Sequence, residues 1–308
     1  MPEVDLPTVP QAAEYLFANW LGTDQQAIWI GSGLSLPANF PTWFGALKTV
    51  CDVCEVDVPS PDADTEEWVA AADECKRASQ QEYGETLHEL FAPGPETHDR
   101  QAYSLLWNLN LQTYVTTNFD PLLYQRSVTR ADAEEYVYRE IEATTLGQDC
   151  KKAYYLHGLA YPGRDPDFVF SESEFDEAYQ DPGLIENFVQ AVLRGFNVLF
   201  VGCTLNDPAL QPVFDEVQRI LQRLEETSDA YSRPNHIILK DVPLEASDDA
   251  TSRNQDINEE KWDELRAHYN DLGLDVVWYI PEDPRFHGEV EEILRTMNDL
   301  LGSGAPQS

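Results

Sequence analysis

Basic residues are scarce in this chain of 308 residues. Lysine and arginine together number 20, against 56 aspartates and glutamates, and the formal net charge is −36. A surface of this sign repels phosphate backbones and anionic lipid headgroups, which argues against direct binding of nucleic acid or membrane. The acidic residues are spread along the chain rather than collected in a tail, which favours adaptation to high salt. An anionic ligand would then be held mainly by backbone N–H groups.

Long apolar runs and a cysteine framework are also missing. No stretch approaches the ~20 apolar residues that a membrane helix needs. The start, Met1-Pro2-Glu3-Val4-Asp5, lacks the basic and then apolar pattern of an export signal. The five cysteines are irregularly spaced, which fits a reducing compartment, so we expect a cytoplasmic protein. With 42 % hydrophobic residues, the chain can bury a sizeable core.

The cysteines match a zinc site poorly. Cys51 and Cys54 form a close pair, but a four-cysteine site needs a second pair, and Cys75 and Cys150 are isolated. Cys51 and Cys54 also share the apolar face of an expected helix. The sequence therefore predicts buried thiols and no metal.

Strand-like and helical segments alternate along most of the chain. Strands are expected at residues 27–30, 112–116, 135–138, 153–156, 167–171, 197–201, 236–239 and 275–280. Four helical stretches separate the first strand from the second. The pattern predicts an α/β fold, with a Rossmann-like parallel sheet and a helical subdomain inserted at residues 41–110. We assign residues 1–308 to a single domain, with a flexible tail at 302–308.

Four strand ends carry glycine, hydroxyl, amide and imidazole groups. Two of these motifs are Gly31-Ser32-Gly33-Leu34-Ser35 and Thr116-Thr117-Asn118-Phe119-Asp120. The other two are Leu156-His157-Gly158 and Gly202-Cys203-Thr204-Leu205. Because the carboxyl ends of parallel strands meet at one edge of a sheet, these motifs predict one crevice there.

Each motif also has a structural explanation. Glycines after a strand allow a tight turn whether or not a pyrophosphate approaches, and the third glycine of the ordinary dinucleotide fingerprint is missing. Asp52 stands at about the distance at which that fingerprint places an acid, but helical spacing puts it on a helix. Asn118 and Asp120 could cap the helix that follows them. His157 is one of six histidines, and His236, which opens a strand, is its weaker rival.

Taken in order, the four motifs resemble those of the sirtuin (SIR2) superfamily, in particular its prokaryotic branch that destroys NAD during antiviral defence. The first is similar to the sirtuin Gly-Ala-Gly turn with its following serine, and the second to the Thr-Gln-Asn-Ile-Asp motif. Leu156-His157-Gly158 matches the position of the catalytic histidine, and Gly202-Cys203-Thr204-Leu205 parallels the cofactor loop Gly-Thr-Ser-Leu. The resemblance covers residues 28–280.

The resemblance implies an NAD+ glycohydrolase, an NADase that uses NAD as its substrate and needs no metal. His157 would be the general base on a ribose hydroxyl or a water, and Asn118 would position that group. The cofactor-binding residues that it implies are Gly31, Ser32, Gly33, Ser35, Thr117, Asp120, Gly202, Cys203 and Thr204. Cys203 is not expected to act as a nucleophile, because nothing near it in the sequence would lower its pKa.

Two other functions stay open. An NAD-dependent protein deacylase is disfavoured, because residues 40–44 read Phe-Pro-Thr-Trp-Phe where deacylases carry an arginine, and because the zinc module is missing. A non-catalytic NAD- or nucleotide-binding subunit of a defence complex has no need of both Asn118 and His157. For the defence branch we expect NAD depletion by abortive infection, a homo-oligomer, and a separate sensor or activator chain, a HerA-type ATPase rather than a short Argonaute.

Overall fold

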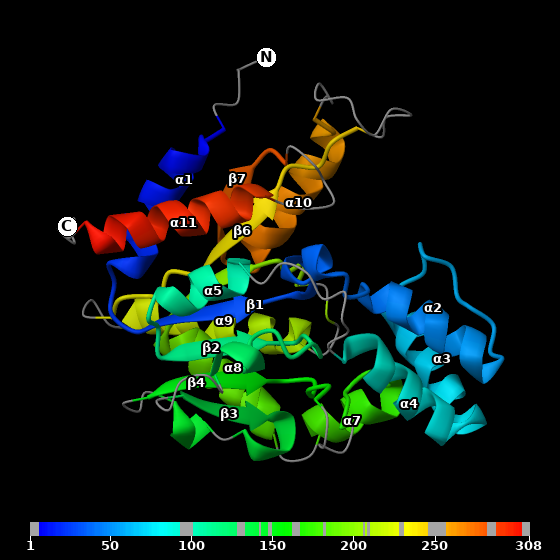
Figure 1. The fold of residues 1–308 in the computed structure, drawn as a ribbon. Coiled ribbons are helices and arrows are strands. Elements are labelled where there is room, and N and C mark those ends of the chain that lie inside the picture. Colours follow the sequence, from blue (N-terminus) through cyan, green and yellow to red (C-terminus); the bar gives the residue numbers. More distant parts are fainter. Residues whose placement is uncertain are drawn as a thin grey trace.

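One parallel sheet forms the centre of the protein. The computed structural model describes residues 6–92, 101–127, 133–141, 143–146, 150–161, 167–180, 183–205, 207, 210–227, 231–245, 257–281 and 288–303. The strands are β1 (Gln26–Ile30), β2 (Thr113–Thr116), β3 (Ala133–Val137), β4 (Lys151–Tyr155), β5 (Asn197–Val201), β6 (Ile237–Asp241) and β7 (Asp275–Tyr279). They pair in parallel in the order β3-β4-β2-β1-β5-β6-β7 (Figure 1). The predicted α/β fold with a Rossmann-like sheet is confirmed.

The sheet changes its direction of growth at β1. The chain first adds β2, β3 and β4 on one side of β1, and then returns to add β5, β6 and β7 on the other side. Such a reversal opens a crevice at the carboxyl ends of the central strands, because the loops on either side leave toward opposite faces. The loops that follow β1, β2 and β5 therefore border one crevice.

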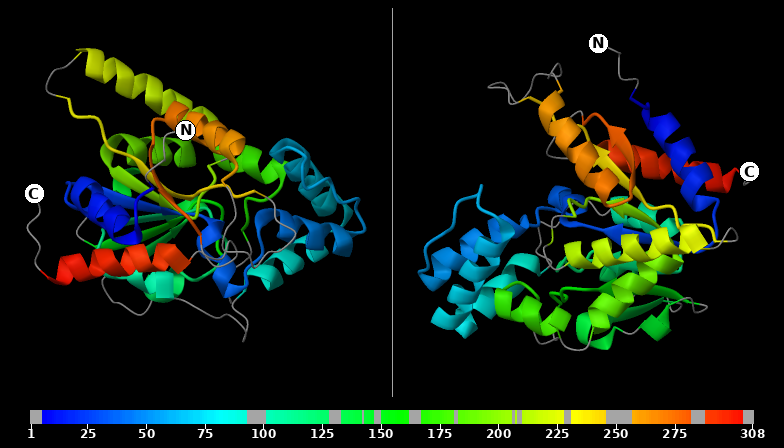
Figure 2. Two further views of the ribbon diagram at one scale, coloured as in Figure 1. Left: turned by 90° about the horizontal axis from the view of Figure 1, so that it is seen from above. Right: turned by 180° about the vertical axis from the view of Figure 1, so that it is seen from behind.

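Helices cover both faces of this sheet. Every residue of β2 and β4 is buried, as are four of the five residues in β1 and in β5, which is typical of a parallel sheet packed on two sides. Views from the front and from behind show α5 (Gln101–Asn108) and α11 (Gly288–Gly302) on one face, and α8 (Leu184–Gly195) and α9 (Gln211–Thr227) on the other (Figures 1 and 2). The helix α1 (Val9–Leu16) packs on α11, and α10 (Glu259–Asp271) packs on β7. A short α6 (Tyr124–Ser127) lies beside β3 and β4.

A group of helices stands beside the carboxyl edge of the sheet. Between β1 and β2 the chain forms α2 (Trp43–Cys54), α3 (Thr65–Ala78), α4 (Gln80–Phe91) and α5. The first three pack against one another, and α3 also contacts α7 (Glu172–Gln180) (Figure 1). We call α2, α3 and α4 the helical lobe. The fourth helix of the expected insertion, α5, packs on α11 instead.

One expected strand is wrong. Residues 167–171 form no strand, although Phe168, Val169 and Phe170 are buried. Their side chains pack under the crevice, where the rings of Phe168 and Phe170 meet Phe119 edge-on at 5.5 and 5.9 Å. A single backbone bond, from the N–H of Val169 to the carbonyl of His157, replaces a ladder. An apolar run can thus be buried by packing alone, without a strand partner.

The other differences concern the ends of elements. The apolar spacing predicts one helix over about residues 10–21, which the structure divides into α1 and a π-helical segment, η1 (Phe17–Leu21). Asp207 and Pro208 predict the start of a long helix reaching about residue 226. The helix α9 begins at Gln211, and residues 208–209 and most of the expected tail, 304–308, lie outside the described part. Asp52 lies on α2, as the spacing predicted.

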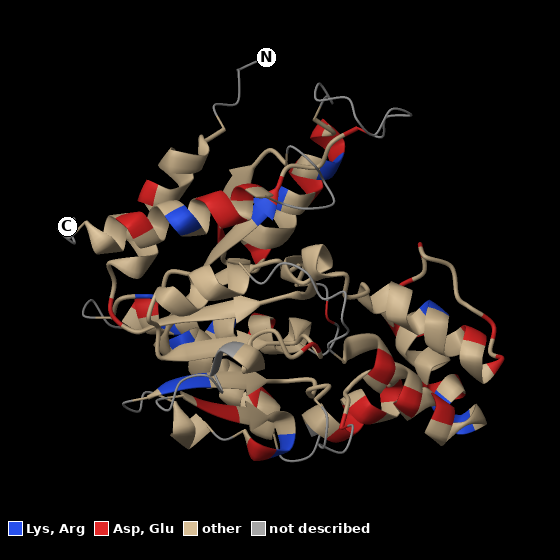
Figure 3. Cartoon of the chain, in the orientation of Figure 1, with Lys and Arg blue, Asp and Glu red and all other residues tan. Residues whose placement is uncertain are grey.

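Acidic residues lie on many of the helices around the sheet (Figure 3). Figure 3 shows Asp and Glu on the helical lobe, on α7 and on α10 and α11, with Lys and Arg scattered among them. Within the described residues, no helix has the length and apolar character needed to cross a membrane.

Candidate active site

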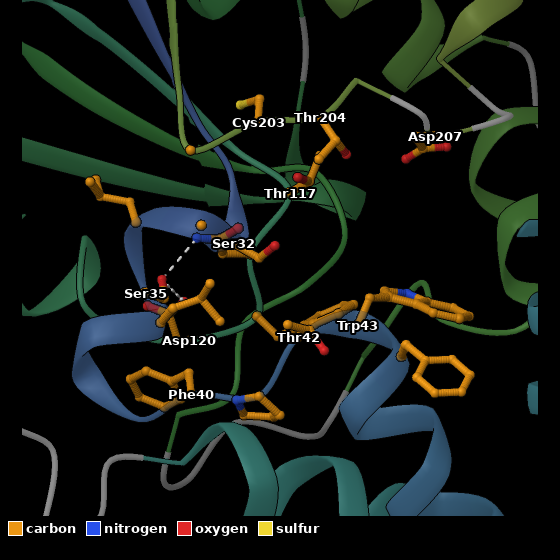
Figure 4. A pocket seen from close by; sticks show the side chains of 18 of the residues that line it. Ser32, Ser35, Phe40, Thr42, Trp43, Thr117, Asp120, Cys203, Thr204 and Asp207 are labelled. Carbon is orange, nitrogen blue, oxygen red and sulfur yellow. Dashed lines mark hydrogen bonds between the residues drawn. The ribbon is translucent and has the colours of Figure 1, made fainter. Parts of the chain in front are cut away.

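The loops after the central strands surround a cavity of about 760 Å³. Ten of the eleven site residues predicted from the sequence line it: Ser32, Gly33, Ser35, Thr117, Asn118, Asp120, His157, Gly202, Cys203 and Thr204. Figure 4 shows Ser32, Thr117, Cys203 and Thr204 on one side of this space and Phe40, Thr42 and Trp43 on another. Residues that are far apart in the sequence therefore meet in one place.

The predicted residues divide into accessible and buried ones. Ser32 and Thr204 are exposed, and Gly33 and Thr117 are half-buried, so these four can be reached by a ligand. Ser35, Asn118 and Asp120 are at most 6 % exposed. The buried ones bond to one another, as described below.

Gly31 and Gly202 bring two loops into direct backbone contact. The N–H of Gly31 donates to the carbonyl of Val201 at 2.9 Å, and that of Gly33 donates to the carbonyl of Gly202 at 3.0 Å. A Cβ on Gly31 would lie 2.3 Å from the carbonyl oxygen of Gly202. Gly202 has a φ of +67°, a conformation that favours glycine. Gly31 itself lies behind this contact and does not line the cavity, so its glycine serves the packing of the two loops.

Asn118 lies at the head of a buried chain of polar groups. Its Nδ2 donates to the carbonyl of Gly31 at 3.1 Å, to Ser35 Oγ at 3.1 Å and to the hydroxyl of Tyr103 at 3.3 Å. Ser35 Oγ lies 2.7 Å from the Tyr103 hydroxyl and donates to Asp120 Oδ2 at 2.7 Å. Since the serine proton points to the carboxylate, the tyrosine hydroxyl donates to the serine. These contacts fix the amide of Asn118 in orientation.

Asp120 ends this chain of hydrogen bonds in a buried position. Its Oδ1 accepts the backbone N–H of Leu122 at 3.1 Å, which caps the turn after β2. Burial raises the pKa of Asp120 to about 6, although the bonds from Ser35 and Leu122 act in the opposite direction. The capping role expected as an alternative is thus present, but Oδ2 also bonds within the Asn118 network.

His157 lines the cavity, and three aromatic rings surround its imidazole. The side chain is 5 % exposed, and the rings of Phe119, Phe175 and Tyr179 lie between 5.2 and 6.4 Å from the imidazole. Its Nε2 lies 2.8 Å from the Tyr179 hydroxyl and 3.5 Å from Asp207 Oδ2. Burial lowers the pKa of His157, while the charge of Asp207 raises it by a smaller amount. The imidazole is therefore held toward its neutral form, as a general base requires.

The rival histidine lies elsewhere. His236 precedes β6 and so stands at the amino edge of the sheet, opposite the crevice. It is 2 % exposed, and burial lowers its pKa to about 4. This histidine is a core residue that does not line the cavity.

The helical lobe contributes an aromatic wall to the cavity. The ring of Trp43 is stacked on Phe170 at 4.4 Å and on Trp68 at 5.8 Å, and Phe44 contacts Trp68 at 5.0 Å. Trp43, Phe44 and Trp68 all line the cavity. A flat aromatic ligand can lie against such a wall.

Positive charge is nearly absent from the cavity. Four carboxylates border it, those of Asp64, Asp120, Asp207 and Asp241. Lys240 is the one basic side chain among the described lining residues, and its Nζ lies 2.6 Å from Asp241 Oδ1. A pyrophosphate would thus depend on backbone N–H groups and hydroxyls.

The cysteines of the protein are free thiols, and one of them, Cys203, lines the cavity. Burial raises the pKa of Cys203 to about 12, which keeps its thiol protonated. Cys51, Cys54 and Cys75 are buried free thiols, as predicted, with the sulfur atoms of Cys51 and Cys75 3.5 Å apart. Within the described ranges, no group of three or more histidine, cysteine or acidic side chains is arranged so that it could hold a metal ion.

The sequence did not identify three neighbours of the expected site residues: Tyr103, Tyr179 and Asp207. Tyr103 comes from α5 and meets Asn118 only through the fold, so no local pattern could have identified it. Asp207 was not among the expected site residues, although it lies within reach of His157. The signal that could have found Asp207 is its place three residues after Thr204, in the loop that was already expected to border the crevice.

Parts of this sequence are similar to known proteins. Residues 112–269, just over half of the chain, match the family described as SIR2-like domain. The chain is also 23 % identical over 223 residues to a protein of Cytobacillus dafuensis named NAD(+) hydrolase ThsA. This similarity covers 72 % of the chain but only 44 % of that relative. The chain thus spans less than half the length of the curated relative that it matches.

Proposed function

This chain belongs to the SIR2-like domain family, and we propose that it is an NAD+ hydrolase that releases nicotinamide and ADP-ribose. The observation that carries the proposal is the meeting of Asn118 and His157 in one cavity, which the loops at Ser32–Gly33 and Gly202–Thr204 also line. A cavity of about 760 Å³ is within the size range of small-molecule sites. The name of the relative supports the same activity.

We propose that NAD+ binds across the strand ends. Its pyrophosphate would lie on the turn at Ser32 and Gly33 and near Thr204, where accessible hydroxyl and N–H groups are available. The nicotinamide would reach the space between Asn118 and His157, and the aromatic wall would receive a ring of the dinucleotide. The carboxylate of Asp120 would favour the cationic pyridinium.

The reaction that we propose breaks the bond between the ribose C1′ and the pyridinium nitrogen. The bonding electrons pass to the ring, so nicotinamide leaves as a neutral molecule and the ribose passes through an oxocarbenium-like state. A water attacks C1′ and transfers its proton to the neutral imidazole of His157. Asn118 would orient the water or a ribose hydroxyl, and its amide is already fixed by Gly31, Ser35 and Tyr103.

Two variants test these roles. His157→Ala and Asn118→Ala should each reduce nicotinamide release by ~10²–10⁴-fold, because a general base and its positioning partner contribute about that much. Cys203→Ala should stay within roughly tenfold of the wild type, since no thiol chemistry is involved. His236→Ala is the matched control, because it removes an equally buried imidazole at the opposite edge of the sheet.

The assay is nicotinamide release from NAD+ under activating conditions, with the partner chain present, at the salt concentration that keeps each variant folded by its melting curve. If His157→Ala keeps near-normal turnover, the proposed site is wrong. If NAD+ loss requires an acetyl-lysine peptide, the chain is a deacylase instead. Binding of NAD+ without any cleavage, in the presence of partner chains, would indicate a non-catalytic subunit.

The biological setting rests on the resemblance of the motifs. We propose that NAD+ depletion serves antiphage defence, that the chain acts as a homo-oligomer, and that a separate chain of the HerA ATPase type activates it. Such control would protect the host from a continuously active NADase.

A further inference from the structure

We propose that Asp207 and Tyr179 are positioning residues for His157, which they hold with its proton on Nε2 so that Nδ1 is the basic atom. The inference rests on the proposed role of His157 as general base. Beyond that role, it specifies which nitrogen of the imidazole accepts the proton and which side chains fix that choice.

The contacts of the imidazole carry the inference. Two oxygen atoms face Nε2: the hydroxyl of Tyr179 at 2.8 Å and Oδ2 of Asp207 at 3.5 Å. A carboxylate can only accept a hydrogen bond, so a proton on Nε2 suits it, whereas a lone pair there would face a negative charge. Among the described residues, no hydrogen-bond partner falls on Nδ1. The neutral ring therefore keeps its lone pair on Nδ1.

The position of Tyr179 is set by the helix that carries it. Phe175 and Tyr179 are one turn apart on α7, and both rings meet His157, at 5.2 and 6.0 Å. The first turn of α7 is anchored by Glu174, whose carboxylate accepts the backbone N–H groups of Phe170 and Ser171 at 3.0 and 2.9 Å.

The same carboxylate fastens α7 to the helical lobe. Glu174 bonds to the hydroxyl of Tyr83 on α4 at 2.7 Å and to Lys76 on α3 at 3.1 Å. The helix that presents Tyr179 to the imidazole is thus held at two places. Tyr179 is therefore presented to the imidazole by a helix that is anchored to its surroundings.

Charge gives Asp207 a second effect. When His157 takes a proton, an imidazolium forms in a box of Phe119, Phe175 and Tyr179, where burial disfavours charge. Asp207, with a side chain 18 % exposed, is the carboxylate that faces the ring. Tyr179 stays neutral because burial raises its pKa, and Asp120 bonds to Ser35 rather than to His157. Asp207 thus stabilises the ion that the reaction creates.

The test compares Asp207→Asn with the wild type across pH. Loss of the carboxylate should lower kcat about tenfold or more, a part of the ~10²–10⁴-fold that a general base contributes. Because Asp207 raises the pKa of His157, its removal should also move the acidic limb of the pH–rate profile to lower pH. A purely structural residue would lower the rate without moving this limb. Asp207→Glu should restore part of the rate.

Tyr179→Phe is a second, independent test of the inference. It removes only the hydroxyl, so kcat should fall several-fold while the acidic limb stays in place. The controls are Asp215→Asn, an exposed aspartate on α9, and Tyr136→Phe on β3. Both should leave rate and pH profile unchanged.

Nitrogen-15 NMR of histidine-labelled protein separates this inference from the proposed function. The His157 signals should show the Nε2–H form in the wild type and a mixture of forms in Asp207→Asn, whether or not turnover is observed. An Nδ1–H form in the wild type would overturn the inference, and so would an unchanged rate and pH profile in Asp207→Asn. Absence of nicotinamide release by the wild type when the activating chain is present would instead count against the proposed function alone.

Discussion

In the protein without ligand, burial disfavours the ionised form of the Asp120 carboxyl. Its replacement by asparagine should therefore stabilise the fold near neutral pH. Burial raises the pKa of this carboxyl from the ordinary 3.8 to about 6. Between these values the folded protein keeps a proton that the unfolded chain releases. The free energy of unfolding of the wild type therefore falls as the pH rises through this range.

The magnitude follows from the size of the shift. A difference of about two pKa units corresponds to about 3 kcal/mol, at about 1.4 kcal/mol per unit. Asparagine cannot ionise, but it offers one oxygen where the carboxylate uses two, to Ser35 and to Leu122. Loss of one such bond costs about 1 kcal/mol at any pH. Asp120→Asn should thus be about 1 kcal/mol less stable than the wild type near pH 4 and about 2 kcal/mol more stable near pH 8.

Urea unfolding of the NAD-free protein at constant high salt, at both pH values, measures this change of sign. Asp215→Asn, which removes an exposed charge from α9, should shift the stability equally at both pH values. A difference between Asp120→Asn and the wild type that does not vary with pH would refute the reasoning. The same variant should release nicotinamide more slowly, because groups that destabilise the fold at a functional site are commonly the ones that activity requires.

Two predictions concern charge on a larger scale. Because the net charge is −36, molar KCl should raise the melting temperature substantially by screening repulsion among carboxylates, and a midpoint that stays flat or falls would contradict adaptation to salt. The cavity is bordered by four carboxylates and by Lys240, which is already paired with Asp241. NADP+ brings an additional phosphate, so its kcat/KM should be at least roughly tenfold below that of NAD+; equal values would show that the phosphate lies away from these carboxylates.

The sequence predicted the strands because their signal is local. β5 was expected at its observed bounds, and the other six strands within about two residues at each end. Residues 167–171 were misassigned because a buried apolar run has the same composition whether it pairs with a strand or packs on Phe119. Nothing in the periodicity could distinguish these outcomes.

The site was predictable where its residues follow strands, and not where they arrive from helices. Asn118 and His157 stand in motifs at strand ends, so the topology of a parallel sheet was enough to place them at one edge. Tyr103 and Tyr179 lie on α5 and α7, whose docking depends on long-range packing. Their hydroxyls bond to Asn118 and His157, but helical spacing alone indicates only a buried face.

The direction of the His157 pKa shift bears on the kind of bond that this site can break. Hydrolysis of an ordinary glycoside needs a general acid to protonate the leaving oxygen. A buried imidazole with a lowered pKa is mostly unprotonated near neutral pH and so has no proton to donate, and Asp120, whose pKa is about 6, bonds to Ser35 within the buried network. A pyridinium leaving group needs no proton, because the bonding electrons neutralise its charge. The proposed site would therefore favour N-glycosides with a cationic base, which is the property that distinguishes NAD+ from neutral nucleosides.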